Sequence, residues 1–579
     1  MKRLIYIALA MAILLVSCKD DYLETSPSTS VGETDLLKTP DLFDKYLNGV
    51  HNYIYYALYT YSWSGCDQMN FNLDYLSGDW VNTVPTINTD YFWWNNHRKP
   101  DGDYAYYYWD YFYTIIERCN RVIELTGDVK GASDEQRNTW LAEGHTIRAW
   151  AYHNLVQLYG KRFVKGEAND NIGVLLRLKV GFDNMPRATV AEVYAQINDD
   201  IKKGLDYFAK GNDLGRKDRI RPGTAYGIAT RIALSQEEWA QAAVYADSAI
   251  VKSGASLQRG KALIDGFNDY NASEWMWGYT VNAAQRYGFY GLFAYLAYNF
   301  KGNSGFRYAA DRTLLNRMAD SDIRWKWFVC YDRGDQIPSD ITAAAASVHF
   351  GGDYDGLPGF EIIGKPIKWY VKDPTVSTAD KLSMRLAEMY YAKAEALAKS
   401  GDEAGAKLTL VNIMNTRDSL YTDATVAALT GDDLISEIMA HRAIDLWGEG
   451  HSFFDMKRTR KMPVRDSSAN CQAYRDYAAL LSTMVQTATD SLITYRAKLA
   501  TALTKEDSTK ILKNIDSWKA DSASSVKLIP RCQARIKRYK ERHVNMIKTL
   551  PKSLDDNVWE FVIPIDEIQG NKECKQNPM

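Results

Sequence analysis

Apolar residues recur at steps of three and four through most of the chain, which is the spacing of one face of an α-helix. The first such run, 42–54, follows Thr39-Pro40-Asp41, a sequence that favours the start of a helix. The same periodicity continues through residues 109–123, 140–158, 190–205, 222–250, 382–416 and 433–447. The pattern therefore predicts a mostly α-helical protein.

Two of these runs predict helical hairpins. Residues 222–234 and 238–250 are apolar stretches rich in small side chains, separated by a short break near Gln236. The same arrangement returns at 382–416, with a break around Gly401. Small residues let paired helices approach closely, and repeated helix–turn–helix units of this kind are typical of a TPR-like scaffold.

Three segments depart from this pattern. Residues 60–103 and 255–380 are irregular and rich in Gly, Asn, Asp, Pro and aromatic side chains. Loops of that length in a compact protein are usually functional rather than simple connectors. Residues 464–550 again carry apolar residues at helical spacing, and they predict an added helical hairpin or small bundle with a mostly charged outer face.

The N-terminus has the pattern of an export signal. Lys2 and Arg3 precede an apolar stretch of 13 residues, Leu4 to Val16, which is too short to span a bilayer. The sequence Leu-Val-Ser-Cys that ends at Cys18 resembles a bacterial lipobox, and the Lys-Asp-Asp after it resembles the surface-export tag of Bacteroidetes lipoproteins. An ordinary secretory signal with an incidental Cys is the alternative. Residues 1–17 are therefore predicted to be a lipoprotein signal peptide, and residues 18–40 the lipidated Cys and a tether.

Composition narrows the class of protein. The 579 residues hold 70 Lys and Arg against 72 Asp and Glu, so charge gives no reason to expect nucleic-acid binding. The mean hydropathy of -0.37 argues against a polytopic membrane protein. Beyond Cys18 the six cysteines are widely spread without a CxxC pair, so a structural zinc is not expected, while disulfides stay open.

Aromatic content is the unusual feature, since Trp, Tyr and Phe make up 13% of the chain. Many rings sit at helical spacing, but others fall in the irregular segments beside amides and guanidinium groups. Rings stack on the apolar face of a sugar while amides and Arg bond its hydroxyls. The predicted ligand-binding residues are Trp80, Trp93, Trp94, Asn95, Asn96, Arg98, Tyr287 and Tyr290. The alternative is that these rings cap the core under long loops or face a partner protein.

No catalytic motif is present, because the chain lacks HExxH, GxSxG and a strand–helix GxGxxG. Residues 359–365 imitate a P-loop, but Pro366 stands where a metal-binding hydroxyl is required. Asp353 and Asp355 could bind calcium, but a solvated loop is the preferred interpretation. Charged residues on predicted helices are interpreted as fold-holding groups: Glu143, His145, Arg385, Glu388, Glu449, Asp455 and Arg458. No catalytic residue, metal or cofactor is predicted.

Several stretches, in order along the chain, resemble the SusD/RagB family of outer-membrane nutrient-binding lipoproteins of Bacteroidetes. They are Ala142 to Gly160, Arg187 to Asp200, residues 222–250, Arg385 to Ala396, Arg442 to Arg458, and Phe561 to Pro578. Together they extend over nearly the whole chain. His441, Asp445 and Ser452 depart from the family pattern, and the segment 464–550 is longer than the family leads us to expect.

The resemblance implies a mostly α-helical, TPR-like, non-catalytic lipoprotein, anchored in the outer membrane and exposed at the cell surface. Residues 41–255 would form an N-terminal TPR region, and residues 256–579 a C-terminal region with a helical insertion at about 464–550. The resemblance also implies a partner, a SusC-like TonB-dependent transporter, to which the protein would deliver captured oligosaccharides. Some relatives handle peptides, so a peptide ligand is the alternative.

Overall fold

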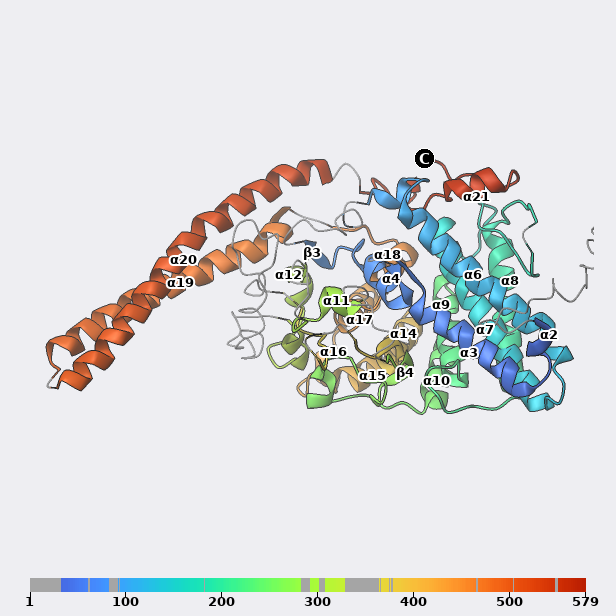
Figure 1. The fold of residues 1–579 in the computed structure, drawn as a ribbon, viewed down its shortest axis with the longest axis horizontal. Coiled ribbons are helices and arrows are strands. Elements are labelled where there is room, and N and C mark those ends of the chain that lie inside the picture. The colour runs from blue at the N-terminus through green and yellow to red at the C-terminus, as the bar shows by residue number, and fades with distance from the viewer. Residues whose placement is uncertain are drawn as a thin grey trace, which may run out of the picture.

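The structure, a computed structural model, confirms a mostly α-helical protein with long irregular connections (Figure 1). It describes residues 33–60, 63–82, 92, 94–181, 183–282, 292–300, 308–328, 364, 366–373, 375, 378–464, 467–502, 504–546 and 550–579. The predicted signal peptide and Cys18 therefore lie outside the described residues. Within the part of the chain that the structure describes, no helix is both long and apolar enough to cross a membrane.

Helices make up both the N-terminal and C-terminal parts of the body. The N-terminal helices are α2 (Glu33–Leu36), α3 (Pro40–Tyr56), α4 (Gly65–Asp74), α6 (Asp103–Leu125), α7 (Asp134–Tyr159), α8 (Val190–Phe208), α9 (Pro222–Ser235) and α10 (Trp239–Ser253). The C-terminal helices are α11 (Leu292–Leu296), α12 (Arg312–Leu315), α14 (Leu386–Lys399), α15 (Glu403–Met414), α16 (Asp423–Val426), α17 (Gly431–Asp445), α18 (Ser452–Thr459), α19 (Ser467–Ala500), α20 (Lys505–Met546) and α21 (Ile565–Gly570).

Helix α3 begins where the sequence predicts, and side-chain caps also start α7 and α8. Thr39 caps α3 and Pro40 occupies its first turn, while Ser133 and Thr189 form capping boxes at α7 and α8. The predicted hairpins form as α9–α10 and α14–α15, and α14 also packs against α10. Gly223 shows why small residues are needed, because a Cβ there would lie 2.5 Å from Cα of Ser253 on α10. The TPR-like scaffold is thereby confirmed.

Short antiparallel strand pairs lock the irregular segments onto the helices. They are β1 (Leu58–Thr60) with β2 (Trp63–Ser64), β3 (Trp80–Asn82) with β5 (Tyr308–Ala310), and β4 (Trp275–Tyr279) with β6 (Lys381–Arg385). Each of the last two pairs joins segments more than 100 residues apart in sequence. These strands, rather than the helices, position the candidate site.

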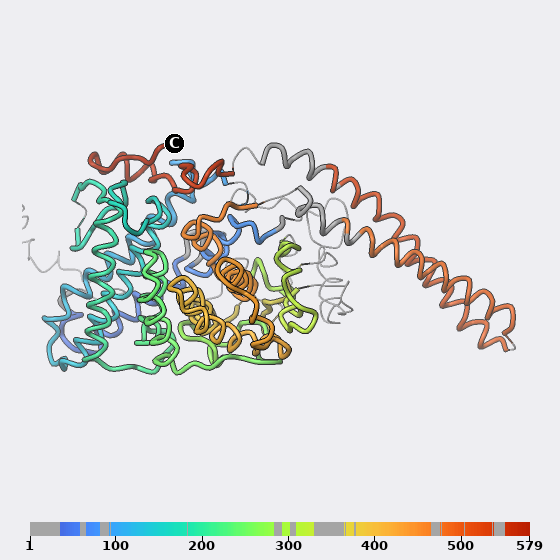
Figure 2. The backbone as a smooth tube through the Cα atoms, turned by 180° about the vertical axis from the view of Figure 1, so that it is seen from behind, coloured from blue at the N-terminus to red at the C-terminus, as the bar shows by residue number. Residues whose placement is uncertain are grey.

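Helices α19 and α20 form a long arm that projects away from the body (Figures 1 and 2). The apolar seam between them is narrow, with Leu481 and Cys532 buried and Ile529 and Ile536 partly buried against them. The segment 464–550 is thus a two-helix hairpin, one of the two forms that the periodicity predicts.

Candidate ligand-binding face

The two irregular segments with the predicted ligand-binding rings meet at the β3–β5 pair. Asn82 pairs with Tyr308, and the amide of Ala310 donates to the carbonyl of Gly364 over 2.8 Å. A further bridge joins Phe328 to Pro366. Residues that flank 83–91, 301–307 and 329–363 therefore lie together. We call this mostly buried group, formed by β3, β5, Gly364 and Pro366, the anchoring face.

A group of buried aromatic rings, which we call the aromatic floor, packs around the anchoring face. Trp80 stacks on Trp447 with ring centroids 3.8 Å apart and an interplanar angle of 18°. Tyr308 meets Tyr75 edge to face at 4.9 Å. The Phe71 ring in α4 stacks at 5.7 Å on Tyr295 in α11, the helix that follows residues 283–291. Phe92 and α11, which adjoin the two aromatic segments, thus pack on one floor of buried rings.

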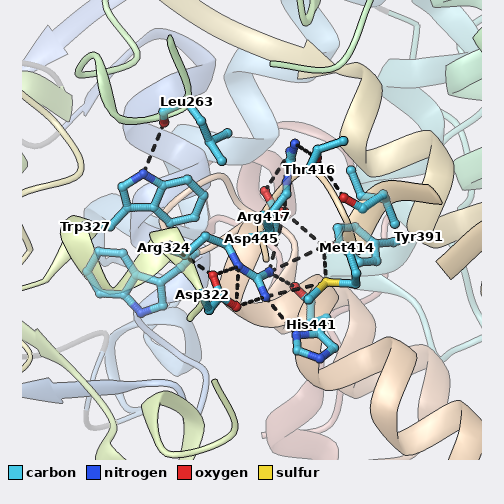
Figure 3. A network of polar contacts seen from close by, with 12 residues as sticks. Leu263, Asp322, Arg324, Trp327, Tyr391, Met414, Thr416, Arg417, His441 and Asp445 are labelled. Carbon is cyan, nitrogen blue, oxygen red and sulfur yellow. Dashed lines mark hydrogen bonds and ion pairs between the residues drawn. The ribbon is translucent and has the colours of Figure 1, made fainter. Parts of the chain in front are cut away.

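Beside this floor lies a buried network of charges, seen in part in Figure 3. Arg385 contacts Asp445 at 2.6 Å, Glu274 at 2.7 Å and Glu449 at 2.8 Å. Arg417 binds the other oxygen of Asp445 at 2.7 Å and also Glu274 at 2.9 Å. These side chains come from the ends of β4 and β6, from α17 and from the loops after α15 and α17, so the network ties distant segments to one point.

Two residues that depart from the family pattern belong to this network. Arg324, in the 3₁₀ helix η7 (Ile323–Trp327), donates to Nδ1 of His441 at 2.8 Å and pairs with Asp322 at 2.6 Å (Figure 3). Burial favours the neutral form of Asp445, but Arg417, Arg385 and Arg324 hold its pKa well below the usual value. The carboxylate is therefore permanently charged and fully engaged, which fits a structural role.

A second group of charges confirms the structural interpretation of Asp455 and Arg458. Arg458 binds Glu395 of α14 and pairs with Asp455 at 2.7 Å. Glu388 does not pair with Arg385, three residues before it in the chain, but with Arg231 of the α9–α10 hairpin at 2.6 Å. These contacts cross between α9, α14 and α18, and they hold the hairpins in register.

Glu143 and His145 also hold the fold together, as the sequence predicts. Glu143 contacts Arg219 and His51, each at 2.7 Å, and His145 contacts Asp200 at 2.7 Å. All of these side chains are buried except for a slight exposure of His145. The contacts join α7 to α3 and α8.

The structure corrects the prediction for two of the rings. Trp80 is 2% exposed and Trp94 is 1% exposed, and Nε1 of Trp94 donates to the carbonyl of Leu76 at 2.7 Å. A ring without an exposed face cannot stack on a sugar, so both belong to the core. The prediction fails because irregular chain here forms core rather than surface.

Arg98 likewise has a structural partner. Its guanidinium donates to the carbonyls of Asn557 at 2.8 Å and Glu560 at 2.5 Å, and also to that of Pro578. Neighbouring Asn95 and Asn96 are half-buried at the start of the 3₁₀ helix η2 (Asn96–Arg98). Arg98 therefore holds the C-terminal segment in place.

Trp93, Tyr287 and Tyr290 lie outside the described residues, as do Asp353, Asp355 and 359–363.

Comparison with known families decides the identity of the fold. The family model described as the SusD family matches residues 253–579, more than half of the chain. The chain belongs to the SusD family. A second model, described as starch-binding associating with outer membrane, matches residues 21–234 of this SusD-family chain. A search of curated protein sequences found no match to this chain.

Solved structures of the superfamily share this fold. A SusD-like carbohydrate binding protein from Bacteroides vulgatus is 23% identical, with a TM-score of 0.62 over 74% of this chain and 85% of its own. A SusD superfamily protein from Bacteroides thetaiotaomicron is 17% identical, with a TM-score of 0.65 over 93% and 100%. Surface glycan-binding protein A from Bacteroides uniformis is 17% identical, with a TM-score of 0.56 over 75% and 91%.

Cavities in this SusD-family chain differ in what they can hold. A space of about 70 Å³ between α4, α7, α9 and α18, lined by Arg231, His451 and Asp455 among others, has room for about two waters. A groove of about 610 Å³ lies over the first turns of α3 and α7, around Asp44 and Trp140. Asp44 already accepts hydrogen bonds from Nε1 of Trp140 at 3.2 Å and from Arg219 at 3.1 Å, which leaves this groove without a distinctive ligand chemistry. Among the described residues, no group of His, Cys, Asp or Glu could hold a metal ion.

The buried ion pairs predict a specific acid sensitivity. Burial raises the pKa of Glu143 and of Glu388, but the charges and hydrogen bonds of Arg219 and Arg231 outweigh it and lower each pKa from 4.5 to about 2. Because the folded-state pKa is depressed, the stabilisation is complete above about pH 4.5 and is lost as the pH falls toward 2. Each group contributes on the order of 3 kcal/mol.

Urea unfolding from pH 5.5 to 2.5 checks this expectation. The free energy of unfolding should fall steeply below about pH 4.5, and Glu388→Gln should show a shallower slope, by close to one proton, over the same range. Equal slopes in the two proteins would show that Glu388 titrates normally. Comparing slopes cancels contributions from other groups, including Asp74, whose pKa burial raises to about 7.

Proposed function

We propose that this SusD-family chain captures oligosaccharides at the cell surface and delivers them to a SusC-like TonB-dependent transporter. In this proposal a lipid on Cys18 anchors the chain to the outer membrane, and the chain performs no chemistry on its ligand. Family membership and the description of the model that matches residues 21–234 support a carbohydrate ligand. The names of the similar structures point the same way.

One observation of the chain itself carries the proposal. Phe92, next to Trp93 in sequence, and α11, which follows residues 283–291, pack on the same aromatic floor of Phe71 and Tyr75. Phe92, beside Trp93, packs against Tyr75 at 5.3 Å, and Tyr295, five residues after Tyr290, stacks on Phe71. The floor uses its own rings for packing, which leaves ligand contact to Trp93, Tyr287 and Tyr290.

Trp93→Ala and Tyr290→Ala are expected to weaken oligosaccharide binding without destabilising the protein. Loss of one stacking ring costs on the order of 1–2 kcal/mol, which is roughly a tenfold change in affinity. A glycan array identifies the ligand, calorimetry measures the affinity of each variant, and thermal unfolding checks stability. Tyr245→Ala on α10 is the control, because it removes an aromatic ring, half-buried in this case, from the α9–α10 hairpin.

Three results would count against this proposal. Binding to a peptide pool with no response on the glycan array would replace the oligosaccharide by a peptide ligand. Release of reducing ends from a polysaccharide would overturn the non-catalytic role. Full retention of glycan affinity in the Trp93→Ala/Tyr290→Ala double variant would remove these rings from the site.

The transporter and the anchor are tested separately. The chain should co-purify from outer membranes with a TonB-dependent transporter, and Cys18→Ala should release it from the membrane fraction. Recovery of Cys18→Ala in the outer membrane at the wild-type level would contradict lipid anchoring at this position.

A further inference from the structure

A buried ion pair lies where α3, α4 and β6 meet. Lys381, the first residue of β6, contacts Asp67 in the first turn of α4 at 2.9 Å, and their side chains are 4% and 2% exposed, respectively. Nζ of Lys381 also donates to the carbonyl of Tyr55 in the last turn of α3 at 3.1 Å. The helix dipoles favour an acid near a helix N-terminus and a cation near a helix C-terminus, which accounts for the two residue types.

The other carboxylate oxygen of Asp67 contacts the start of α11. Oδ2 accepts from the amide of Leu292, the first residue of this helix, at 3.4 Å, while Oδ1 binds the ammonium group. Residues 283–291, which we call the ring segment because they include Tyr287 and Tyr290, directly precede Leu292. Asp67 therefore fixes the point at which the chain returns to the body after the ring segment.

The residue before Lys381 fixes the chain on the other side of the ring segment. Oδ1 of Asp380 accepts from the amide of Val281 at 3.1 Å, and Oδ2 accepts from the amide of Tyr270 at 3.0 Å. Val281 follows β4, whose last residue, Tyr279, pairs with Lys381. Two adjacent residues, with Cα atoms about 3.8 Å apart, thus hold the chain on both sides of the ring segment, one of them directly and the other through its ion pair.

Stability of the fold alone does not account for a charged pair at this position. Moving both charges from water into the interior offsets most of the attraction between them, so apolar side chains of similar volume usually hold such elements equally well. Strands β4 and β6 are already joined by backbone pairing, and Phe71 of α4 stacks on Tyr295 of α11. What the pair adds is an acceptor for the amide of Leu292, held in one direction by the ammonium group.

Fixing both ends of a segment lowers the cost of ordering it when a ligand binds. A chain whose ends are already held has fewer conformations to lose, and a site ordered in advance gains affinity because binding costs less entropy. We propose that Asp67, Lys381 and Asp380 are positioning residues, which hold the ring segment so that Tyr287 and Tyr290 meet an oligosaccharide. This inference rests on the proposed oligosaccharide-binding function and adds the residues that prepare one part of its site.

Two double variants of the full-length protein remove the ion pair. Asp67→Leu/Lys381→Met replaces both charges by apolar side chains, so that no buried charge is left unpaired and the fold is kept. Asp67→Asn/Lys381→Met also removes both charges, but it keeps an oxygen that can accept from the amide of Leu292. Asp200→Leu/Arg148→Met is the control, because this buried pair, at 2.6 Å, joins α8 to α7 instead.

Calorimetry measures binding of maltoheptaose, xylohexaose and trigalacturonate, and the variants are compared with the probe that the wild type binds most tightly. Asp67→Leu/Lys381→Met should weaken binding about tenfold, through a less favourable binding entropy. Asp67→Asn/Lys381→Met should remain closer to the wild type, and the Asp200→Leu/Arg148→Met control should equal it. Thermal unfolding checks that every variant folds.

A comparison in two backgrounds shows whether the pair acts through the ring segment. In Tyr287→Ala/Tyr290→Ala, adding Asp67→Leu/Lys381→Met should cause no further loss of affinity, because the rings that the pair positions are absent. In Trp93→Ala, which lies in the other aromatic segment, the same addition should still cost about tenfold. Equal losses in both backgrounds would show that the pair acts elsewhere.

The remaining outcomes separate this inference from the proposed function. No binding of any probe by the wild type counts against both, whereas wild-type affinity in a folded Asp67→Leu/Lys381→Met rejects the positioning role alone. An equal loss in the Asp200→Leu/Arg148→Met control would make the effect one of general stability. Asp380→Ala, which releases only the other side of the ring segment, should also weaken binding, and it decides the question if the ion-pair variants do not fold.

Discussion

Replacing Arg385 by leucine is expected to lower the free energy of unfolding by about 3–5 kcal/mol, one of the two largest effects that the structure predicts. Arg385 is 1% exposed and contacts Glu274, Asp445 and Glu449. Leucine would leave three buried carboxylates sharing fewer cations, and an uncompensated buried charge costs far more than a lost surface pair. Urea unfolding of the two proteins at pH 7 measures the difference.

Lys393→Ala is the matched control for Arg385→Leu. Lys393 lies on the same helix, α14, and pairs with Asp247, but this pair is partly exposed and should contribute no more than about 1 kcal/mol. Arg385→Lys provides a finer comparison, since an ammonium keeps the charge but cannot reach three carboxylates in fixed directions. We expect it to fall between the other two. A cost for Arg385→Leu as small as that of Lys393→Ala would show that the network does not hold the fold.

The sequence predicted the helical scaffold because the signals for it are local. Thr39, Ser133 and Thr189 are capping residues a few positions from the helices that they start, and the apolar spacing that follows is read within one segment. The hairpins followed in the same way, because small residues and a short break are neighbours in sequence. The structure confirms the helices and the hairpins because both depend on residues that are close in sequence.

The candidate site was harder to predict because its geometry depends on distant pairings. Trp80 looked exposed in irregular sequence, but pairing with β5 and stacking on Trp447 place it in the core. Those partners lie more than 200 residues away. Arg98 resembled a donor for sugar hydroxyls until the C-terminal segment supplied its carbonyl acceptors. In each case the residue type was compatible with both roles, and only the long-range contact decides.

The arm shows a mixed situation, in which its form could be predicted from the sequence but its place of attachment could not. Periodicity in 464–550 indicated paired helices and a charged outer face, which is what α19 and α20 form. The sequence does not indicate where the arm attaches, because helix α19 packs against β3 and α12, which lie much earlier in the chain.

Trp80→Ala is expected to reduce the free energy of unfolding by about 3–5 kcal/mol, because it empties a large space in the core. It also removes the stack with Trp447 and the edge contacts of Trp80 with Phe71 and Tyr75. Since the anchoring face rests on these rings, ligand binding should weaken along with stability. Thermal unfolding and calorimetry on the same preparation measure both.

A double-mutant cycle with Trp447→Ala separates core packing from ligand contact. The two rings touch at 3.8 Å, so the single substitutions should not add, and the double variant should cost clearly less than the sum of the two. Trp93→Ala should behave in the reverse manner, with weaker binding and an unchanged unfolding midpoint. If Trp80→Ala instead abolished binding while the midpoint stayed at the wild-type value, Trp80 would be a ligand contact and its burial between Trp447 and Tyr75 would have to open when the ligand binds.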